Sequence, residues 1–339
     1  MTTTPYDVAI IGGGPAGLGA AVALGRSRRS VLVIDAGEPR NAPAAGAHNV
    51  LGLEGIAPTD LLSRGRSEAS AYGVAFLDGA VHTAAHDDGG FRLTVGPARP
   101  GGDAVVAGSG EPGATQPSTV RARRLLLATG LVDVLPEVPG VRDGWGHSVL
   151  HCPYCHGWEV RDQRIGILAS DARAAHQALL FHQLSDQVTI LPGWTAPADG
   201  TPDAAWEAGE DAALFEALGV PVASAPVTAL SLDGTQVRAA LLADGSSVEL
   251  DAVVVAPSFV ARTEIYEQLG GDPEEHPMGR FIPADPTGRT PIPGVWAAGN
   301  AQNLMAMVSA SSAAGVQAGA AINGDLALED AARLQQNPR

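Results

Sequence analysis

A glycine-rich turn near the start of the chain constrains the fold more than any other feature. Gly12, Gly14 and Gly17 form a GxGxxG pattern between two apolar runs, which cover residues 7–11 and 31–35. Continuous apolar runs are typical of parallel strands that are covered on both faces of a sheet. The small residues between the glycines and the second run favour a helix. The sequence therefore predicts a βαβ unit with a right-handed connection.

The same pattern indicates a dinucleotide site. The first glycine allows the tight turn, the second lets the backbone approach a pyrophosphate, and the third lets the helix pack on the strand. Asp35 ends the second strand, 18 residues after Gly17, where a carboxylate accepts ribose hydroxyls. This acid disfavours a 2′-phosphate, so FAD or NAD fits better than NADP. The alternative is a glycine-rich turn without a ligand.

Composition excludes several classes of protein. The formal net charge of −16 repels phosphate backbones and anionic lipids, which argues against nucleic-acid or membrane-surface binding. The 45% hydrophobic fraction over 339 residues predicts a soluble globular protein of two or three domains. The uncharged stretch over 8–25 contains six glycines and a proline, so we interpret it as neither a signal peptide nor a membrane span. We expect a cytoplasmic protein.

Later segments predict the remaining architecture. Alternating stretches over 80–95 and 120–129 suggest an antiparallel excursion from the first sheet, and the Gly/Pro/Ser/Thr-rich residues 96–119 between them suggest a surface loop without a function. A second strand-helix-strand pattern covers 164–191, with Ala174, Ala178 and Phe181 on one helix face. A further buried strand is expected over 250–256, and residues 294–299 lead into a small-residue helix. We expect an α/β protein in which the first and last regions form one discontinuous domain and the middle region is inserted.

The two cysteines form one CxxC motif. Cys152 and Cys155 are flanked by His151 and His156, and no other cysteine is present. Such a pair closes and reopens a disulfide by thiolate attack, so redox cycling is the favoured interpretation. A metal site is disfavoured because four ligands within six adjacent residues would be strained. An inert structural pair remains open, and the likeness of CPYC to glutaredoxins is local only.

Taken together, these motifs resemble the low-molecular-weight thioredoxin reductases. The likeness rests on the GGGPAG turn, on Ala128-Thr129-Gly130 after a strand, on the CxxC, and on the stretch from Pro293 to Asn300. It implies a homodimeric FAD flavoprotein with two Rossmann-like domains of the three-layer ββα kind. The implied segments are the FAD domain at 1–136 and 258–330, an inserted NAD(P)-type domain at 137–257, and a C-terminal tail at 331–339.

The resemblance also implies roles for single residues. Cys155 would face the flavin, Cys152 would exchange with substrate, and His156, which stands where the family has an acid, would move thiol protons. His156 as a spectator and a structural His151 remain open, and Asn41 and His48 are as compatible with a surface loop as with the flavin. The residues expected at FAD are Gly12, Gly14, Pro15, Ala16, Gly17, Asp35, Ala36, Arg40, Asn41, His48, Ala128, Thr129, Gly130, Gly299 and Asn300.

Departures from the family concern NADPH. Where a reductase has a second GxGxxA, this chain has Ala169 and Asp171, and the carboxylate would repel a pyrophosphate. No cation follows the next strand, at 191–194, where the 2′-phosphate would be held. The family's Arg-Gln pair is replaced near Val308, and its Gly-Asp pair becomes Gly-Asn, in which Asn300 still serves a ribityl hydroxyl.

This combination resembles a narrower branch, the dithiol oxidases that close disulfides in microbial natural products of the gliotoxin, holomycin and romidepsin kind. The likeness lies in the stretches 152–159 and 40–52. It implies FAD without NADPH or a metal, a small dithiol as substrate, and molecular oxygen as the acceptor that becomes hydrogen peroxide. An NADPH-dependent disulfide reductase and a flavin-bound redox sensor that does not turn over are the alternatives.

Overall fold

The computed structural model describes residues 5–98, 118–195 and 204–336. The chain divides into two compact units. Unit 1 comprises Met1–Ala42, Val50–Val132 and Phe259–Arg339, and unit 2 comprises Pro43–Asn49 and Asp133–Ser258. Most of the surface loop expected over 96–119 lies outside the described residues.

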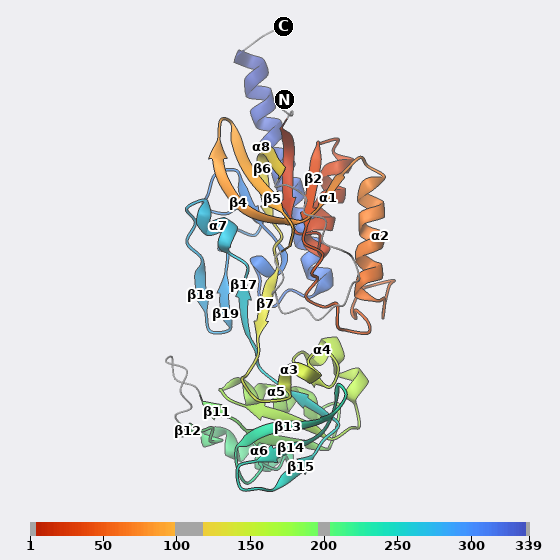
Figure 1. Cartoon of the computed structure of the whole chain (residues 1–339), viewed down its shortest axis with the longest axis vertical. Coiled ribbons are helices and arrows are strands. Elements are labelled where there is room, and N and C mark those ends of the chain that lie inside the picture. Colours follow the sequence, from red (N-terminus) through yellow and green to blue (C-terminus); the bar gives the residue numbers. More distant parts are fainter. Residues whose placement is uncertain (1–4, 99–117, 196–203, 337–339) are drawn as a thin grey trace. The chain divides into compact units, whose positions relative to one another are not determined.

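The first three elements form the βαβ unit that the glycine pattern predicts (Figure 1). Strands β1 (Tyr6–Ile11) and β2 (Val31–Asp35) are parallel neighbours, and helix α1 (Pro15–Arg26) connects them. Pro15 stands in the first turn of the helix, where its missing N–H has no intrahelical partner to lose. The apolar side chains of both strands are almost fully buried, as expected for a sheet covered on both faces.

A seven-stranded sheet forms the centre of unit 1. Its order is β3-β2-β1-β6-β5-β4, and β20 also pairs with β6. The pairs that involve β1, β2, β3 and β20 are parallel, whereas β4, β5 and β6 are joined by antiparallel pairing, so the predicted antiparallel excursion is confirmed. The further strands are β3 (Ala75–Asp78), β4 (Ala80–Asp87), β5 (Gly90–Gly96), β6 (Ser118–Leu127) and β20 (Val295–Ala297).

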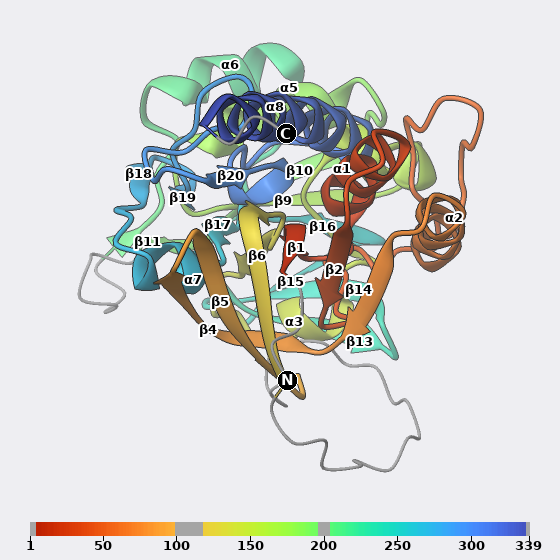
Figure 2. The same cartoon turned by 90° about the horizontal axis from the view of Figure 1, so that it is seen from above.

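Two apolar clusters cover the faces of this sheet. On one face α1 and the long C-terminal helix α8 (Val308–Gln336) lie side by side (Figure 2), with Ile322 and Leu326 of α8 fully buried. Glycine permits this close approach, because a Cβ on Gly315 would collide with the carbonyl of Ala16. On the other face the core includes Tyr266 of α7 (Glu264–Gln268). Helix α8 continues past residue 331, where the sequence analysis expects a tail to begin.

Ion pairs fix the far half of α8 to the sheet. Arg124 of β6 donates to Asp325 at 2.7 Å and to Glu329 at 2.5 Å. Arg123 reaches Asp330 at 2.6 Å, and the same carboxylate receives Arg29 at 2.6 Å. These side chains are only partly exposed, so the pairs are screened less by solvent than surface pairs are.

The remaining elements of unit 1 are one longer helix, α2, and several short strands and helices. The sheet of order β18-β19-β17-β7 contains two strands, β7 and β17, that each cross a boundary between the units. The elements are α2 (Pro58–Ser70), β7 (Leu131–Val134), β17 (Ser258–Ala261), β18 (Glu274–His276), β19 (Gly279–Phe281) and the short helix η3 (Gly299–Ala301).

Unit 2 contains the second strand-helix-strand pattern. Strands β9 (Ile165–Ala169) and β10 (Val188–Pro192) are parallel, and α5 (Arg173–His182) between them buries Ala174, Ala178 and Phe181, as predicted. The four-stranded parallel sheet has the order β10-β9-β16-β8. Its strand β16 (Ala252–Val254) is shorter than the strand expected over 250–256.

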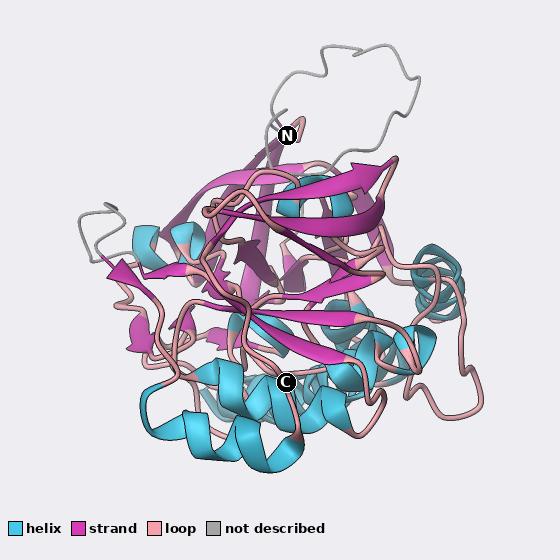
Figure 3. Cartoon of the chain, turned by 90° about the horizontal axis from the view of Figure 1, so that it is seen from below, coloured by secondary structure: helices cyan, strands magenta, loops and turns pink. Residues whose placement is uncertain are grey.

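The other elements of unit 2 are α3 (Val141–Gly144), β8 (Val149–Leu150), α4 (Pro153–His156), η1 (Trp158–Val160), β11 (Trp194–Thr195), β12 (Ala204–Ala205), η2 (Gly209–Asp211), α6 (Ala212–Leu218), β13 (Val227–Asp233), β14 (Gln236–Leu242) and β15 (Ser247–Glu249). Strands β13, β14 and β15 form an antiparallel sheet. Both units combine helices with parallel strands, which confirms the α/β class. Figure 3 shows the helices and strands of the described chain in separate colours. Within the described ranges, no helix is both long and apolar enough to cross a membrane.

Candidate active site

The glycine turn of unit 1 has the geometry of a phosphate cradle. Gly12 has a φ of +108°, and a Cβ there would collide with the carbonyl of Ala128. A Cβ on Gly17 would collide with the carbonyl of Gly12, whereas the space beside Gly14 is open to 4 Å. Gly14 is also the N-cap of α1 and contributes no side chain there. Backbone N–H groups at such a helix start bind anionic groups.

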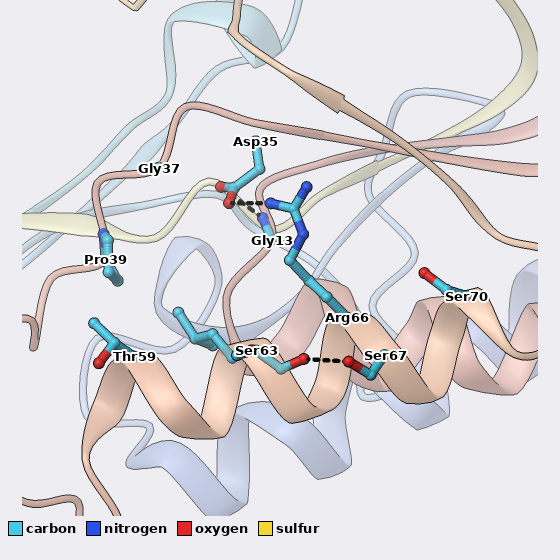
Figure 4. A pocket seen from close by; sticks show the side chains of 10 residues that line it. Gly13, Asp35, Gly37, Pro39, Thr59, Ser63, Arg66, Ser67 and Ser70 are labelled. Carbon is cyan, nitrogen blue, oxygen red and sulfur yellow. Dashed lines mark hydrogen bonds and ion pairs between the residues drawn. The ribbon is translucent and has the colours of Figure 1, made fainter. Parts of the chain in front are cut away.

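Asp35 lies beside this turn and borders an open cavity of about 690 Å³. Its Oδ1 accepts a hydrogen bond from the backbone N–H of Gly13 at 3.0 Å. Figure 4 shows the Asp35 carboxylate facing Arg66 of α2, with 3.8 Å between Arg66 Nη1 and Asp35 Oδ2. The cavity therefore joins the carboxylate expected at the ribose to the phosphate cradle. Helix α2 adds a row of hydroxyls to the lining: Thr59, Ser63, Ser67 and Ser70.

Sequence reasoning missed Arg66 and the hydroxyl row. Arg66 lies 4.6 Å above the ring of Phe76 and pairs with Asp78 at 2.7 Å, so its guanidinium is held in place beside Asp35. The spacing of Ser63 and Ser67, four residues apart on a helix, is the signal that was available. Whether these hydroxyls line a cavity depends on the position of α2 against β2, which the sequence does not specify.

A second group of expected FAD residues meets around Asn300. Arg40 Nη1 donates to Asn300 Oδ1 at 3.3 Å, and the Arg40 guanidinium lies 5.1 Å from the ring centre of Phe259. The Asn300 amide donates to the carbonyls of Asn303 and Ala306 at 3.0 and 2.9 Å. Asn300 is thus oriented by its own loop. Gly299 before it has a φ of +70°.

The other unit 1 residues expected at FAD lie after β6, after β2 and in the first turn of α1. Thr129 follows β6 and donates its hydroxyl to the carbonyl of Arg262 at 2.8 Å, and Gly130 has a φ of +70°. Ala16 is buried in the first turn of α1, beside Pro15. Ala36 is exposed and follows Asp35, while Asn41 is half-buried.

The CxxC of unit 2 forms a disulfide. Cys152 and Cys155 are bonded, with 5.2 Å between their Cα atoms. Cys152 is the N-cap of the one-turn helix α4, and its carbonyl accepts the N–H of Cys155 at 3.2 Å. Pro153 starts the helix without needing an N–H partner. A helical turn therefore brings the two thiols into bonding range, which is the arrangement needed for thiol–disulfide exchange.

His156, the residue after Cys155, has a ring nitrogen that makes no hydrogen bond within the part of the chain that the structure describes. Its Nε2 is buried and has no hydrogen-bond partner among the described residues. Burial lowers the pKa of His156 below its ordinary value of 6.5; the Glu159 carboxylate opposes this shift, and His48 and His147 add to it. The imidazole is therefore neutral at pH 7 and available to accept a proton.

The two other candidate histidines have different surroundings. His151 Nδ1 lies 3.2 Å from the carbonyl of Val255, so that ring is oriented by the backbone after β16. His48 belongs to the segment Pro43–Asn49 of unit 2, and its Nε2 lies 3.4 Å from Glu159 Oε1. The structure thus groups His48 with the disulfide segment within unit 2.

The second nucleotide-type turn is occupied by side chains of the chain itself. After β9, Asp171 Oδ1 accepts the backbone N–H of Arg173 at 2.8 Å, at the start of α5. The Arg173 guanidinium pairs with the same carboxylate at 2.6 Å and donates to the carbonyls of Ala256 and Pro257, each at 2.8 Å. Burial would raise the pKa of Asp171, but the bonds from Arg173 hold it below its usual range. The first N–H of α5, which could otherwise bind an external anionic group, is therefore already paired with the carboxylate of Asp171.

Comparison with known proteins assigns the chain to a family. The model of the pyridine nucleotide-disulphide oxidoreductases matches residues 6–315. The chain belongs to this family. As expected for a member, it resembles thioredoxin reductase tcpT of Claviceps purpurea (strain 20.1), with 31% identity over 319 residues that cover 88% of this chain and 87% of the relative.

Further relatives of this oxidoreductase extend over nearly its whole length. Thioredoxin reductase sirT of Leptosphaeria maculans is 29% identical over 339 residues, which cover 95% of each protein. The crystal structure of HlmI superposes with a TM-score of 0.80 at 37% identity, covering 98% of this chain and 96% of HlmI. These matches confirm the resemblance to thioredoxin reductases and the two Rossmann-like domains. This oxidoreductase is a flavin-dependent enzyme of thiol–disulfide exchange.

Proposed function

We propose that the chain is an FAD-dependent dithiol oxidase that closes an intramolecular disulfide in a small-molecule natural product. Molecular oxygen is the proposed electron acceptor, and the protein works as a homodimer in the cytoplasm. In this proposal residues 1–136 and 258–330 hold FAD, and residues 137–257 carry the disulfide without binding NADPH.

The observation that carries the proposal is the ion pair of Asp171 and Arg173. The family resemblance implies that a reductase binds NADPH at the turn that corresponds to the one after β9, and that it receives its electrons there. Here the carboxylate of Asp171 already accepts the first N–H of α5, and Arg173 holds that carboxylate. A pyrophosphate at this place would have to displace this ion pair, and it meets a helix terminus whose first N–H is already in use. In this proposal the electrons therefore come from the substrate thiols and not from NADPH.

The unit 1 site fits FAD. The glycine cradle leaves room for a pyrophosphate at Gly14, where a Cβ would meet nothing within 4 Å. Asp35, which lines the open cavity, would accept the ribose hydroxyls, and the oriented amide of Asn300 would serve the ribityl chain. Bound FAD would take two electrons from the dithiol of Cys152 and Cys155 and pass them to oxygen, giving hydrogen peroxide.

The chemistry of the chain's own residues begins at the disulfide. A substrate thiolate attacks Cys152 Sγ, the bond to Cys155 breaks, and Cys155 leaves as a thiolate. The second substrate thiolate then attacks the substrate's own sulfur in the mixed disulfide, and Cys152 leaves as a thiolate. The substrate departs as a cyclic disulfide, and the enzyme keeps two electrons in its two thiols. His156 accepts one of the two thiol protons, because its neutral Nε2 is free for it.

The second attack explains why the substrate must be a dithiol. Two thiols in one small molecule have a high effective concentration toward each other, so resolution needs no second collision. A monothiol stops at the mixed disulfide and turns over poorly.

An NADPH-dependent disulfide reductase is the second candidate. It is favoured by the names of the relatives tcpT and sirT, which are both thioredoxin reductases. The two candidates differ in the direction of electron flow, so one experiment separates them.

The test follows flavin absorbance without oxygen. The purified yellow protein receives NADPH in one sample and dithiothreitol in another. We expect bleaching at 450 nm by the dithiol alone, and recovery with stoichiometric peroxide when air is admitted. A Cys152→Ser protein is the control that must stay yellow with dithiol. Rapid bleaching by NADPH would instead establish the reductase.

A further inference from the structure

A pair of side chains next to His156 has no part in the thiol steps above. His48 Nε2 and Glu159 Oε1 lie 3.4 Å apart, and their side chains are 22% and 43% exposed. Both residues belong to unit 2, although more than 100 positions separate them in the sequence. Glu159 lies in η1, directly after the CxxC turn.

The position of His48 is specified by its neighbours. Asn49 Nδ2 donates to the carbonyl of Tyr154, between the two cysteines, at 2.8 Å. A Cβ on Gly146 would lie 2.9 Å from Pro43 Cβ, so the other end of the segment also packs closely on unit 2. Ala47 is 5% exposed. The segment from Pro43 to Asn49 therefore packs on unit 2 and is hydrogen-bonded to the disulfide turn.

Glu159 and His156 lie on the same side of this turn. They are three residues apart, and Gly157 between them has helical angles (φ −70°, ψ −32°). Residues at this spacing face the same side of a helical turn. The groups that act electrostatically on His156 are Glu159, which favours its protonated form, and His48 and His147, which disfavour it.

We propose that Glu159 and His48 are a positioning pair for the thiol base. The proton of the substrate S–H passes to His156 Nε2, the thiolate remains on the substrate, and the ionised Glu159 stabilises the imidazolium that forms. His48 holds the carboxylate in place and, through its own charge, limits how strongly His156 retains the proton. The kinetic part of this inference rests on the proposed dithiol oxidation, whereas the effect on His156 does not.

The first test measures His156 directly in the FAD-loaded protein. Histidines labelled with ¹³C at Cε1 are titrated by NMR, and His156→Asn identifies the signal. Glu159→Gln should lower the pKa of His156, because the negative charge is lost. His48→Gln keeps a hydrogen-bond donor but cannot be protonated, so it should raise that pKa. Glu216→Gln, an exposed carboxylate of α6, is the matched control and should change nothing.

The second test is kinetic. With dithiothreitol and air, Glu159→Gln should shift the acidic limb of kcat/KM to lower pH and reduce its plateau about tenfold, which is less than the roughly 10²–10⁴-fold effect of losing a proton-transfer group. A merely structural role would not move the pH limb.

The outcomes are distinguishable. If the pKa of His156 changes with the same sign in Glu159→Gln and His48→Gln, or changes in neither, the proposed positioning pair is wrong. If dithiol is not oxidised at all, the proposed function fails, and the NMR titration still decides the pair. Should His48→Gln not fold, as judged by circular dichroism, His48→Asn takes its place.

Discussion

The guanidinium of Arg173 holds the carboxylate of Asp171 at the first turn of α5, with 2.6 Å between Arg173 Nη2 and Asp171 Oδ2. Removing this anion and restoring a glycine turn should create room for a pyrophosphate. We expect the double variant Ala169→Gly/Asp171→Gly to bind NADPH more tightly than the wild-type protein, measured by calorimetry. Asp186→Gly, an exposed carboxylate between α5 and β10, is the control. Equal affinity in the double variant and this control would mean that the ion pair does not exclude the nucleotide.

Asp35 should dominate affinity for the adenosine part of FAD. A charge-assisted hydrogen bond contributes about 1.5–3 kcal/mol, so Asp35→Ala should weaken FAD binding by roughly 10- to 100-fold. The measurement is fluorescence quenching as FAD is added back to flavin-free protein. Asp78→Ala is the matched control, because Asp78 also pairs with Arg66 but does not line the cavity. A similar loss in both variants would assign the effect to Arg66.

Each cysteine should be essential for dithiol oxidation but not for FAD binding. Cys152→Ser and Cys155→Ser each remove one sulfur of the disulfide, so no exchange with a substrate thiol is possible. We expect no oxygen consumption with dithiothreitol and an unchanged ratio of absorbance at 450 and 280 nm. Activity in either serine variant would remove the CxxC from the mechanism.

His156 should make the enzyme active below the usual range of a histidine base. Burial lowers its pKa below 6.5, so the neutral base persists as the pH falls to that lowered pKa and is lost only below it. We expect the acidic limb of kcat/KM to lie below pH 6.5 and to disappear in His156→Gln, with a rate loss of roughly 10²–10⁴-fold. The limb must be measured with one dithiol at saturating oxygen. An unchanged limb in His156→Gln would point to another group.

The ion pairs of α8 should stabilise unit 1. Arg124→Met leaves Asp325 and Glu329, both partly buried, without their main partner, which should lower the free energy of unfolding by about 1–3 kcal/mol. Urea unfolding followed by circular dichroism measures this. The control is Arg238→Met, whose pair with Asp233 is exposed and should contribute about 0–1 kcal/mol.

The same pairs give a pH dependence with a definite sign. Burial would raise the pKa values of Asp325 and Glu329, but Arg124 holds both below their ordinary values of 3.8 and 4.5. Their contribution is therefore full above about pH 4.5 and is lost as the pH falls through the lowered values. The difference in stability between wild type and Arg124→Met should shrink on acidification. A constant difference would show that these carboxylates do not titrate with folding.

The sequence predicted local structure well because local rules decide it. The glycine turn, the bounds of β2 and the buried face of α5 follow from residue spacing alone, and all agree with the structure. The family assignment is likewise confirmed by the match over residues 6–315. The roles of the individual site residues remain predictions that the variants above test.

What the sequence did not reveal depends on long-range packing. Nothing in the residues around His48 indicates that it faces Glu159, because their proximity arises from the course of the chain around unit 2. Arg66 was missed for the same reason, since it lies beside Asp35 only because of the position of α2 in the fold. The ion pair between Arg173 and Asp171 could not be predicted from the sequence either. The two residues are close in the chain, but the long side chain of Arg173 can point in many directions.

The segment from Pro43 to Asn49 limits how this enzyme can be recombined. A chimera that exchanges only the continuous stretch from Asp133 to Ser258 transplants Glu159 and both cysteines but leaves His48 and Asn49 with the recipient. The seven residues from Pro43 to Asn49 must be exchanged together with that stretch, although they lie far upstream of it in the sequence. Unit 2 is thus encoded by two separate stretches of the sequence, and exchange of the longer stretch alone separates His48 from Glu159.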